Sequence, residues 1–177
     1  MSIRSEADRL IRETGLTAIL SRHGTPAFTG SYFMDTMAWN DLDLYLQPGE
    51  NFDPYAMIAD LNAVLRPFRF DGFVDDRSIF YGCETNITGV RWNIDIWIRS
   101  AERIAESHAF CSDLLQKMNA QPGAREAILA IKTDLITKGM YGFDKHPSRH
   151  YHSREIYDAV LNEGILSTEA FLQRYPL

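Results

Sequence analysis

The stretch GSYFMDTMAWNDLD, residues 30–43, decides how this chain folds. Its last three residues, Asp41-Leu42-Asp43, begin an alternation that continues through residues 44–46, with leucines on one side and Asp or Tyr on the other. A period of two is typical of a strand with one buried face. Because residues i and i+2 of a strand point the same way, about 6.5 Å apart, Asp41 and Asp43 are predicted to form a pair of carboxylates on one face.

A third acid, Asp95, lies in the middle of a second alternating run, residues 89–98. If the two strands lie side by side, the three carboxylates converge. Two bare charges about 4 Å apart repel by roughly 4 kcal/mol at an effective dielectric of about 20, so such a cluster needs a shared proton or cation. Hard oxygen ligands favour Mg²⁺, and two such ions promote in-line displacement at phosphorus.

Gly30 and Ser31 precede the acid pair and have the character of a phosphate site. A glycine lets the backbone approach a phosphate closely, and the serine offers a hydroxyl. A short helix starting at Tyr32 would direct its amide-rich end at the same anion.

In order and spacing, Gly30-Ser31, Asp41-Leu42-Asp43 and Ile94-Asp95-Ile96 resemble the polymerase-β-like nucleotidyltransferase superfamily. The stretch from Gly30 to Asp35 is also similar to the Gly-Gly-Trp-Ala-Val-Asp stretch of lincosamide and aminoglycoside nucleotidyltransferases. The resemblance implies a nucleotidyltransferase fold and transfer of a nucleoside monophosphate from an NTP to a hydroxyl of a small molecule or protein.

The resemblance also implies site roles. Asp41 and Asp43 would hold two Mg²⁺ ions, Asp95 would ligate one of them and accept the acceptor's proton, and Gly30-Ser31 would bind the triphosphate. Lys132, and with less support Lys138, lie on a predicted helix after the third acid and are candidates for neutralising phosphate charge. The alternative is a catalytically silent copy of the fold that acts as an antitoxin-like binding partner or a nucleotide sensor. The intact acids favour the enzyme.

The segment KHPSRHYHSR, residues 145–154, holds three of the five His and no acid. It is interpreted first as a polar connection between helices. A basic loop that meets phosphates or the acceptor, or a His metal site at 146, 150 and 152, are the alternatives. His23 and His108 lie near no nucleophile pattern and are interpreted as structural.

Three tryptophans, Trp39, Trp92 and Trp97, flank the acids in sequence. A nucleotide base could stack on one of them, but an aromatic side chain at a sheet surface more often covers the core.

The predicted strands fall in residues 1–100 and the rest of the chain is predicted to be helical. The fold class is therefore α+β: a small mixed sheet flanked by helices in residues 1–100, and a C-terminal helical extension, residues 101–177, packed on it. Helices are expected from Ser5 to about Arg22, from Pro54 to before Pro67, and at 101–118, 124–140, 153–162 and from 167. Strands are expected at 27–31 and 41–46, and a hairpin at 78–85 and 89–98. Ser153 is the expected N-cap of the helix at 153–162.

The chain has 24 Asp and Glu against 18 Lys and Arg, a formal net charge of -6. This balance argues against a nucleic-acid binder that works by neutralising phosphates, although a protein partner is compatible with it. No apolar stretch approaches the roughly 18 residues of a membrane span, and the N-terminus lacks the apolar run of a signal peptide. Two cysteines, Cys83 and Cys111, are interpreted as buried and unbridged in a reducing compartment. A cytoplasmic protein is expected.

Overall fold

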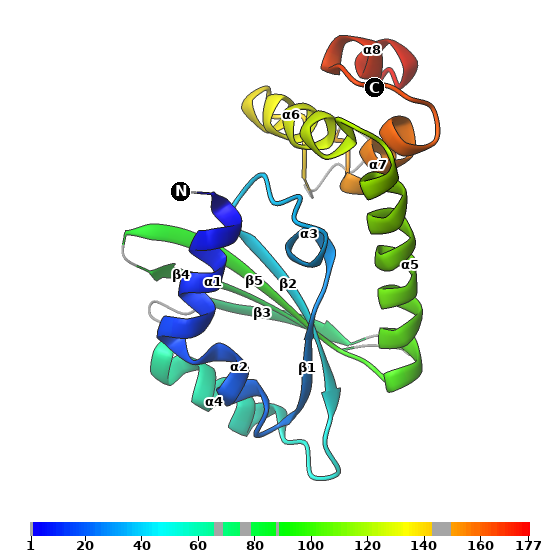
Figure 1. The fold of residues 1–177 in the computed structure, drawn as a ribbon. Helices are drawn as coiled ribbons and strands as arrows, with labels where there is room; N and C mark the ends of the chain where they lie inside the picture. The colour runs from blue at the N-terminus through cyan, green and yellow to red at the C-terminus, as the bar shows by residue number, and fades with distance from the viewer. Residues whose placement is uncertain (1, 66–68, 75–78, 88, 143–149) are drawn as a thin grey trace. The chain divides into compact units, whose positions relative to one another are not determined.

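The computed structural model describes residues 2–65, 69–74, 79–87, 89–142 and 150–177. In chain order the elements are α1 (Ile3–Thr14), α2 (Leu16–Leu20), β1 (Gly24–Phe28), α3 (Gly30–Phe33), β2 (Asp41–Pro48), α4 (Pro54–Val64), β3 (Arg69–Val74), β4 (Ile79–Ile87), β5 (Val90–Ile98), α5 (Ala101–Ala120), α6 (Ala124–Thr137), α7 (Ser153–Leu161) and α8 (Thr168–Arg174) (Figure 1). The chain divides into two compact units, Met1–Cys111 and Ser112–Leu177. The division falls inside α5, whereas the sequence places the change from strands to helices near residue 100.

The first unit is built on a five-stranded mixed sheet in the order β1-β2-β5-β4-β3. β2 and β5 run parallel, and the other three pairs are antiparallel. This arrangement, with the flanking helices, confirms the expected mixed sheet.

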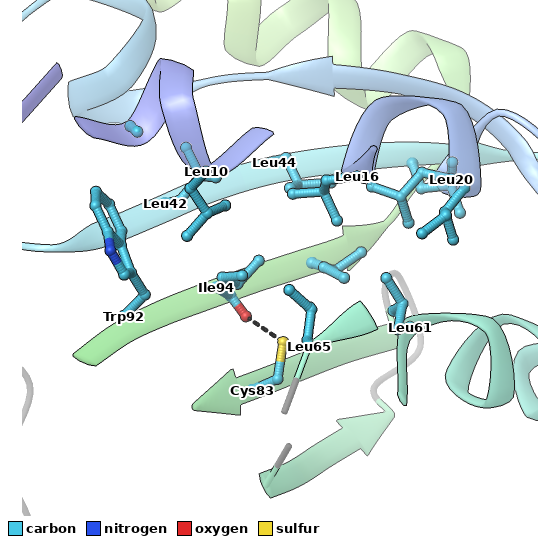
Figure 2. Close-up of a cluster of buried hydrophobic side chains, with 14 of the residues drawn as sticks. Leu10, Leu16, Leu20, Leu42, Leu44, Leu61, Leu65, Cys83, Trp92 and Ile94 are labelled. Carbon is cyan, nitrogen blue, oxygen red and sulfur yellow. Dashed lines mark hydrogen bonds between the residues drawn. The ribbon is translucent and has the colours of Figure 1, made fainter. Parts of the chain in front are cut away.

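One face of this sheet carries the hydrophobic core. The even-numbered residues of β2 and β5 are buried, as the alternation predicts: Leu42, Leu44, Leu46, Ile94, Ile96 and Ile98. Helices α1, α2 and α4 cover them with Leu10, Leu16, Leu20 and Leu61 (Figure 2). Cys83 belongs to the same cluster and donates its thiol hydrogen to the carbonyl oxygen of Ile94 over 3.1 Å. Both cysteines are free and buried.

Several predicted boundaries differ from the structure. The first predicted helix is two helices, because Gly15 adopts a left-handed conformation, with φ of 67°, and ends α1. β1 begins and ends three residues earlier than expected, since Gly30 already belongs to α3. The N-cap of α7 is His152, not Ser153, and its backbone N–H donates to the Glu155 carboxylate.

The sequence predicted no strand between the helix that begins at Pro54 and the hairpin, yet β3 lies there and pairs with β4. The hairpin itself is confirmed: β4 and β5 pair from Ile79↔Ile98 to Ile87↔Val90.

The second unit is helical. Its core consists of apolar residues from α6, α7 and α8 together with one lysine: Ala127, Ile128, Ile131, Lys132, Leu135, Ile156, Val160 and Phe171. In the described part of the chain, no helix combines the length and the apolar character that a bilayer span needs.

Candidate functional site

The parallel pair β2–β5 brings two of the three predicted acids together. Asp43 lies opposite Asp95 in the register of the pair, and Asp41 lies opposite Asn93. All three acids are half-buried and lie on the face away from the leucine core, because the residues between them are the buried ones. The register therefore brings Asp43 and Asp95 together, whereas the convergence of all three carboxylates stays a prediction.

Gly30 lies directly against this pair. Its φ is +58°, a conformation that L side chains rarely adopt, and a Cβ added there would lie 2.9 Å from Oδ2 of Asp43. The close approach is fixed by the hydrogen bonds that start α3, in which Phe33 N–H donates to the Thr29 carbonyl and Met34 N–H to the Gly30 carbonyl. A Cβ at position 30 would force the Asp43 carboxylate or the α3 backbone to shift.

Burial in the first place, and the neighbouring charge of Asp43 in the second, together raise the pKa of Asp95 to about 6. Gly82 of β4 lies opposite Asp95 on the other side, and a Cβ there would meet the ring of Phe80 at 3.0 Å and Oδ1 of Asp95 at 3.5 Å. Two backbone positions without side chains thus flank the acid pair. A glycine inside a strand pattern is a sequence signal for such close approach.

The donor set fits a hard divalent cation. Asp43 and Asp95 supply carboxylate oxygens on adjacent strands. Burial first, and the charge of Asp43 second, disfavour the ionised form of Asp95, and a bound cation would offset both effects. Within the described residues, no group of three or more His, Cys, Asp or Glu side chains is arranged to hold a metal ion by itself. Mg²⁺ in proteins commonly takes only one or two carboxylates and completes its shell with water and substrate phosphates, and the site matches that situation.

Beyond the acids, the same face carries aromatic and basic side chains. Tyr45 lies opposite Trp97, two residues along from the acid pair, and the ring of Trp97 packs on Phe80 with 4.6 Å between centroids. The guanidinium carbon of Arg99 lies 4.8 Å from the ring centroid of Trp97 and 5.1 Å from that of Tyr45.

His108 of α5 lies near the same tyrosine. Its ring is 6.3 Å from Tyr45 and stacks on Phe33 of α3 at 5.4 Å. The sequence interpretation gave His108 no role near the acids and did not select Arg99, because neither belongs to a local motif.

The other two tryptophans lie elsewhere. Trp92 is buried in the leucine core on the opposite face, and Trp39 is exposed. His23 contacts Asp60, with 3.0 Å between Nε2 and Oδ2, which agrees with its structural interpretation.

Lys132 belongs to the second unit and is buried, with 1% of its surface exposed. Its amino group donates to the hydroxyl of Tyr157 over 2.9 Å and lies 4.7 Å from the centroid of that ring. Lys138 is exposed and pairs with Asp134. The role of Lys132 in phosphate binding stays a prediction, as do the roles of the other site residues. Residues 145–149 of the basic segment, including His146, lie outside the described residues.

No protein-family model matches the sequence, and no curated protein matches it significantly. Solved structures do share its fold. The Cid1 poly(U) polymerase with Mg and 3′-dATP bound superposes with a TM-score of 0.64 at 14% identity, over 89% of this chain and 48% of that one. A cytoplasmic RNA terminal U-transferase superposes with a TM-score of 0.60 at 17% identity, over 89% of this chain and 45% of that one.

The polymerase core of TRAMP, an RNA surveillance complex, gives a TM-score of 0.61 at 15% identity, over 97% of this chain and 50% of that one. The chain thus has the nucleotidyltransferase fold and spans about half the length of these polymerases. A relationship nearest to the lincosamide and aminoglycoside enzymes is not what these neighbours show.

Proposed function

We propose that this chain transfers a nucleoside monophosphate from an NTP to an acceptor hydroxyl in a Mg²⁺-dependent reaction. The observation that carries the proposal is the Asp43–Asp95 pair, aligned on adjacent parallel strands with Gly30 packed against it. In a nucleotidyltransferase fold, this is a set of carboxylates next to a backbone that can approach a phosphate.

Each part of the site has a distinct task in this proposal. Asp41, Asp43 and Asp95 would hold two Mg²⁺ ions, which supply Lewis-acid stabilisation of charge on the transferred phosphoryl group. Gly30 and Ser31 would position the triphosphate beside the acids. Asp95 is also the candidate general base for the acceptor hydroxyl, because a positioned carboxylate can take up a proton in the transition state. We assign it the acceptor's proton.

We propose a small molecule or a protein as the acceptor. Residues 1–100 carry 14 acids against nine Lys and Arg, a balance that repels an RNA backbone. The second candidate is an RNA 3′ hydroxyl, because the structural neighbours include a poly(U) polymerase and an RNA terminal U-transferase.

Thermal unfolding with each NTP, with and without Mg²⁺, tests nucleotide binding. A ligand at about 100 times its Kd adds about 2.7 kcal/mol to the stability of the native state. We expect a Mg²⁺-dependent rise in melting temperature that disappears in the Asp41→Asn, Asp43→Asn double variant. No rise with any nucleotide, or the same rise in the double variant, would contradict the proposal.

Transfer itself is tested by release of pyrophosphate and by label from α-³²P NTPs. Incubation with a single-stranded RNA oligonucleotide separates the two acceptor classes, because RNA transfer lengthens the oligonucleotide. Label on small molecules or protein, with an unchanged oligonucleotide, is expected. Mg²⁺-dependent binding without turnover on any acceptor would instead favour the nucleotide sensor.

A further inference from the structure

Two unsatisfied nitrogen atoms lie near one ring on the face of the acid pair. Nε of Arg99 and Nε2 of His108 are buried and have no hydrogen-bond partner among the described residues. Both side chains approach the ring of Tyr45. The guanidinium carbon of Arg99 lies 5.1 Å from its centroid, and the centroid of the His108 ring lies 6.3 Å from it. Tyr45 lies on β2 only two residues from Asp43.

Buried polar atoms without partners are rare in folded proteins, and each one calls for an explanation such as a water, an ion or a ligand. A guanidinium beside aromatic rings is stabilised in part by the ring electrons, but a buried N–H without a partner still loses its hydrogen bond to water. In the part of the chain that is described, Arg99 contacts no carboxylate: its partners are the rings of Tyr45 and Trp97. A bound hydrogen-bond acceptor would satisfy a nitrogen of this kind.

We infer that Arg99 and His108 bind an anionic group of the acceptor, so the acceptor is a small molecule that carries a carboxylate or a phosphate as well as the reacting hydroxyl. This identification rests on the proposed function, while the anion site itself rests on the geometry around Tyr45. A guanidinium group presents several N–H donors in a planar fork that matches carboxylate and phosphate oxygens. The imidazole ring of His108 has a tautomer that donates from Nε2.

The register of the sheet sets the length of the acceptor. Arg99 follows the last residue of β5 and lies four residues beyond Asp95, and its N–H still donates to the Leu46 carbonyl of β2, so the two positions are about 13 Å apart. Tyr45 and Trp97 lie between them and form an aromatic surface on which the body of the acceptor would pack. The hydroxyl and the anionic group of the acceptor are then separated by up to about 13 Å.

Calorimetric titration of the whole chain with inorganic phosphate, and separately with acetate, tests the anion site. We expect saturable binding of at least one probe, and the tighter of the two identifies the anion. Arg99→Met keeps an unbranched stem over the two rings, and His108→Phe keeps a ring on Phe33, but each removes the unsatisfied nitrogen. Each is expected to weaken probe binding by about tenfold or more.

Arg103→Met is the matched control. Arg103 is exposed near the start of α5, the helix of His108, and its guanidinium pairs with the Glu106 carboxylate at 2.8 Å. It should leave probe binding unchanged. No saturable binding of either probe, or an equal loss in the control, overturns the inference.

A second titration, with Mg·ATP, distinguishes the anion site from the nucleotide site. Arg99→Met is expected to bind Mg·ATP as the wild type does, and Mg·ATP is expected to leave phosphate binding in place. If Arg99→Met loses Mg·ATP, or Mg·ATP displaces the phosphate, Arg99 belongs to the nucleotide site and the inference fails while the proposed function stands. If the wild type binds the anion probe but not Mg·ATP, the anion site stands and the proposed function fails.

Discussion

The Asp95→Asn variant should be more stable than the wild type at neutral pH when no metal is present. Folding raises the pKa of Asp95 from 3.8 to about 6, so the folded chain holds this proton more strongly than the unfolded chain. The associated stability is fully present below pH 3.8 and is lost as the pH rises through 6. Above that window the wild type carries a charged carboxylate that burial and Asp43 disfavour.

The magnitude follows from the two pKa values. A difference between 3.8 and about 6 corresponds to about 3 kcal/mol, and partial contact with water reduces this to about 1–2 kcal/mol. Asparagine has nearly the shape of aspartate and no charge to bury. The free energy of unfolding of Asp95→Asn, minus that of the wild type, should therefore rise from near zero at pH 4 to about 1–2 kcal/mol at pH 7.5.

Urea denaturation at several pH values, in EDTA, measures this difference. Glu50→Gln is the control for the loss of one negative charge, since Glu50 is exposed beyond the end of β2. A pH-independent difference for Asp95→Asn, or a variant less stable than the wild type at pH 7.5, would refute the argument. Adding Mg²⁺ should reduce the advantage of the variant, because the ion stabilises only the wild-type carboxylates.

Two further changes test the packing of the site and of the second unit. Gly30→Ala should lower the free energy of unfolding by about 1–3 kcal/mol, because the residue has φ of +58° and its Cβ would lie 2.9 Å from Asp43 Oδ2. Gly15→Ala, with φ of +67° and nothing within 4 Å, should cost about 1 kcal/mol; equal losses in urea denaturation would show that the contact with Asp43 is unimportant. Tyr157→Phe should cost about 1–3 kcal/mol, since it removes an oxygen that accepts from the buried ammonium of Lys132; an unchanged denaturation midpoint would contradict this.

The strand bearing two of the acids was predictable because its signal is local. The alternation from Asp41 to Leu46 predicts both the strand and its buried face, and in the structure those leucines are completely buried. The sequence did not predict that this strand pairs with the strand of Asp95, because alternation does not specify which strand lies beside another. The parallel register that puts Asp43 opposite Asp95 is a property of the folded sheet.

The parts that the sequence did not predict have conflicting or non-local signals. Asp71-Gly72 has the composition of a turn, yet these residues lie inside β3, where pairing with β4 decides the conformation. Likewise Arg99 and His108 lie on different elements from Tyr45 and share no motif with it. Only the folded sheet and α5 bring them to one ring.

The parallel pairing of β2 and β5 has a consequence for folding. The chain between these strands holds α4, β3 and β4, so the pair closes a long loop, and such contacts form slowly relative to hairpins. The β4–β5 hairpin can assemble from neighbouring segments, whereas Asp43 meets Asp95 only when β5 inserts beside β2. A Mg·nucleotide would thus bind only after the sheet is complete. A nascent chain whose β5 is still inside the ribosome would lack the site.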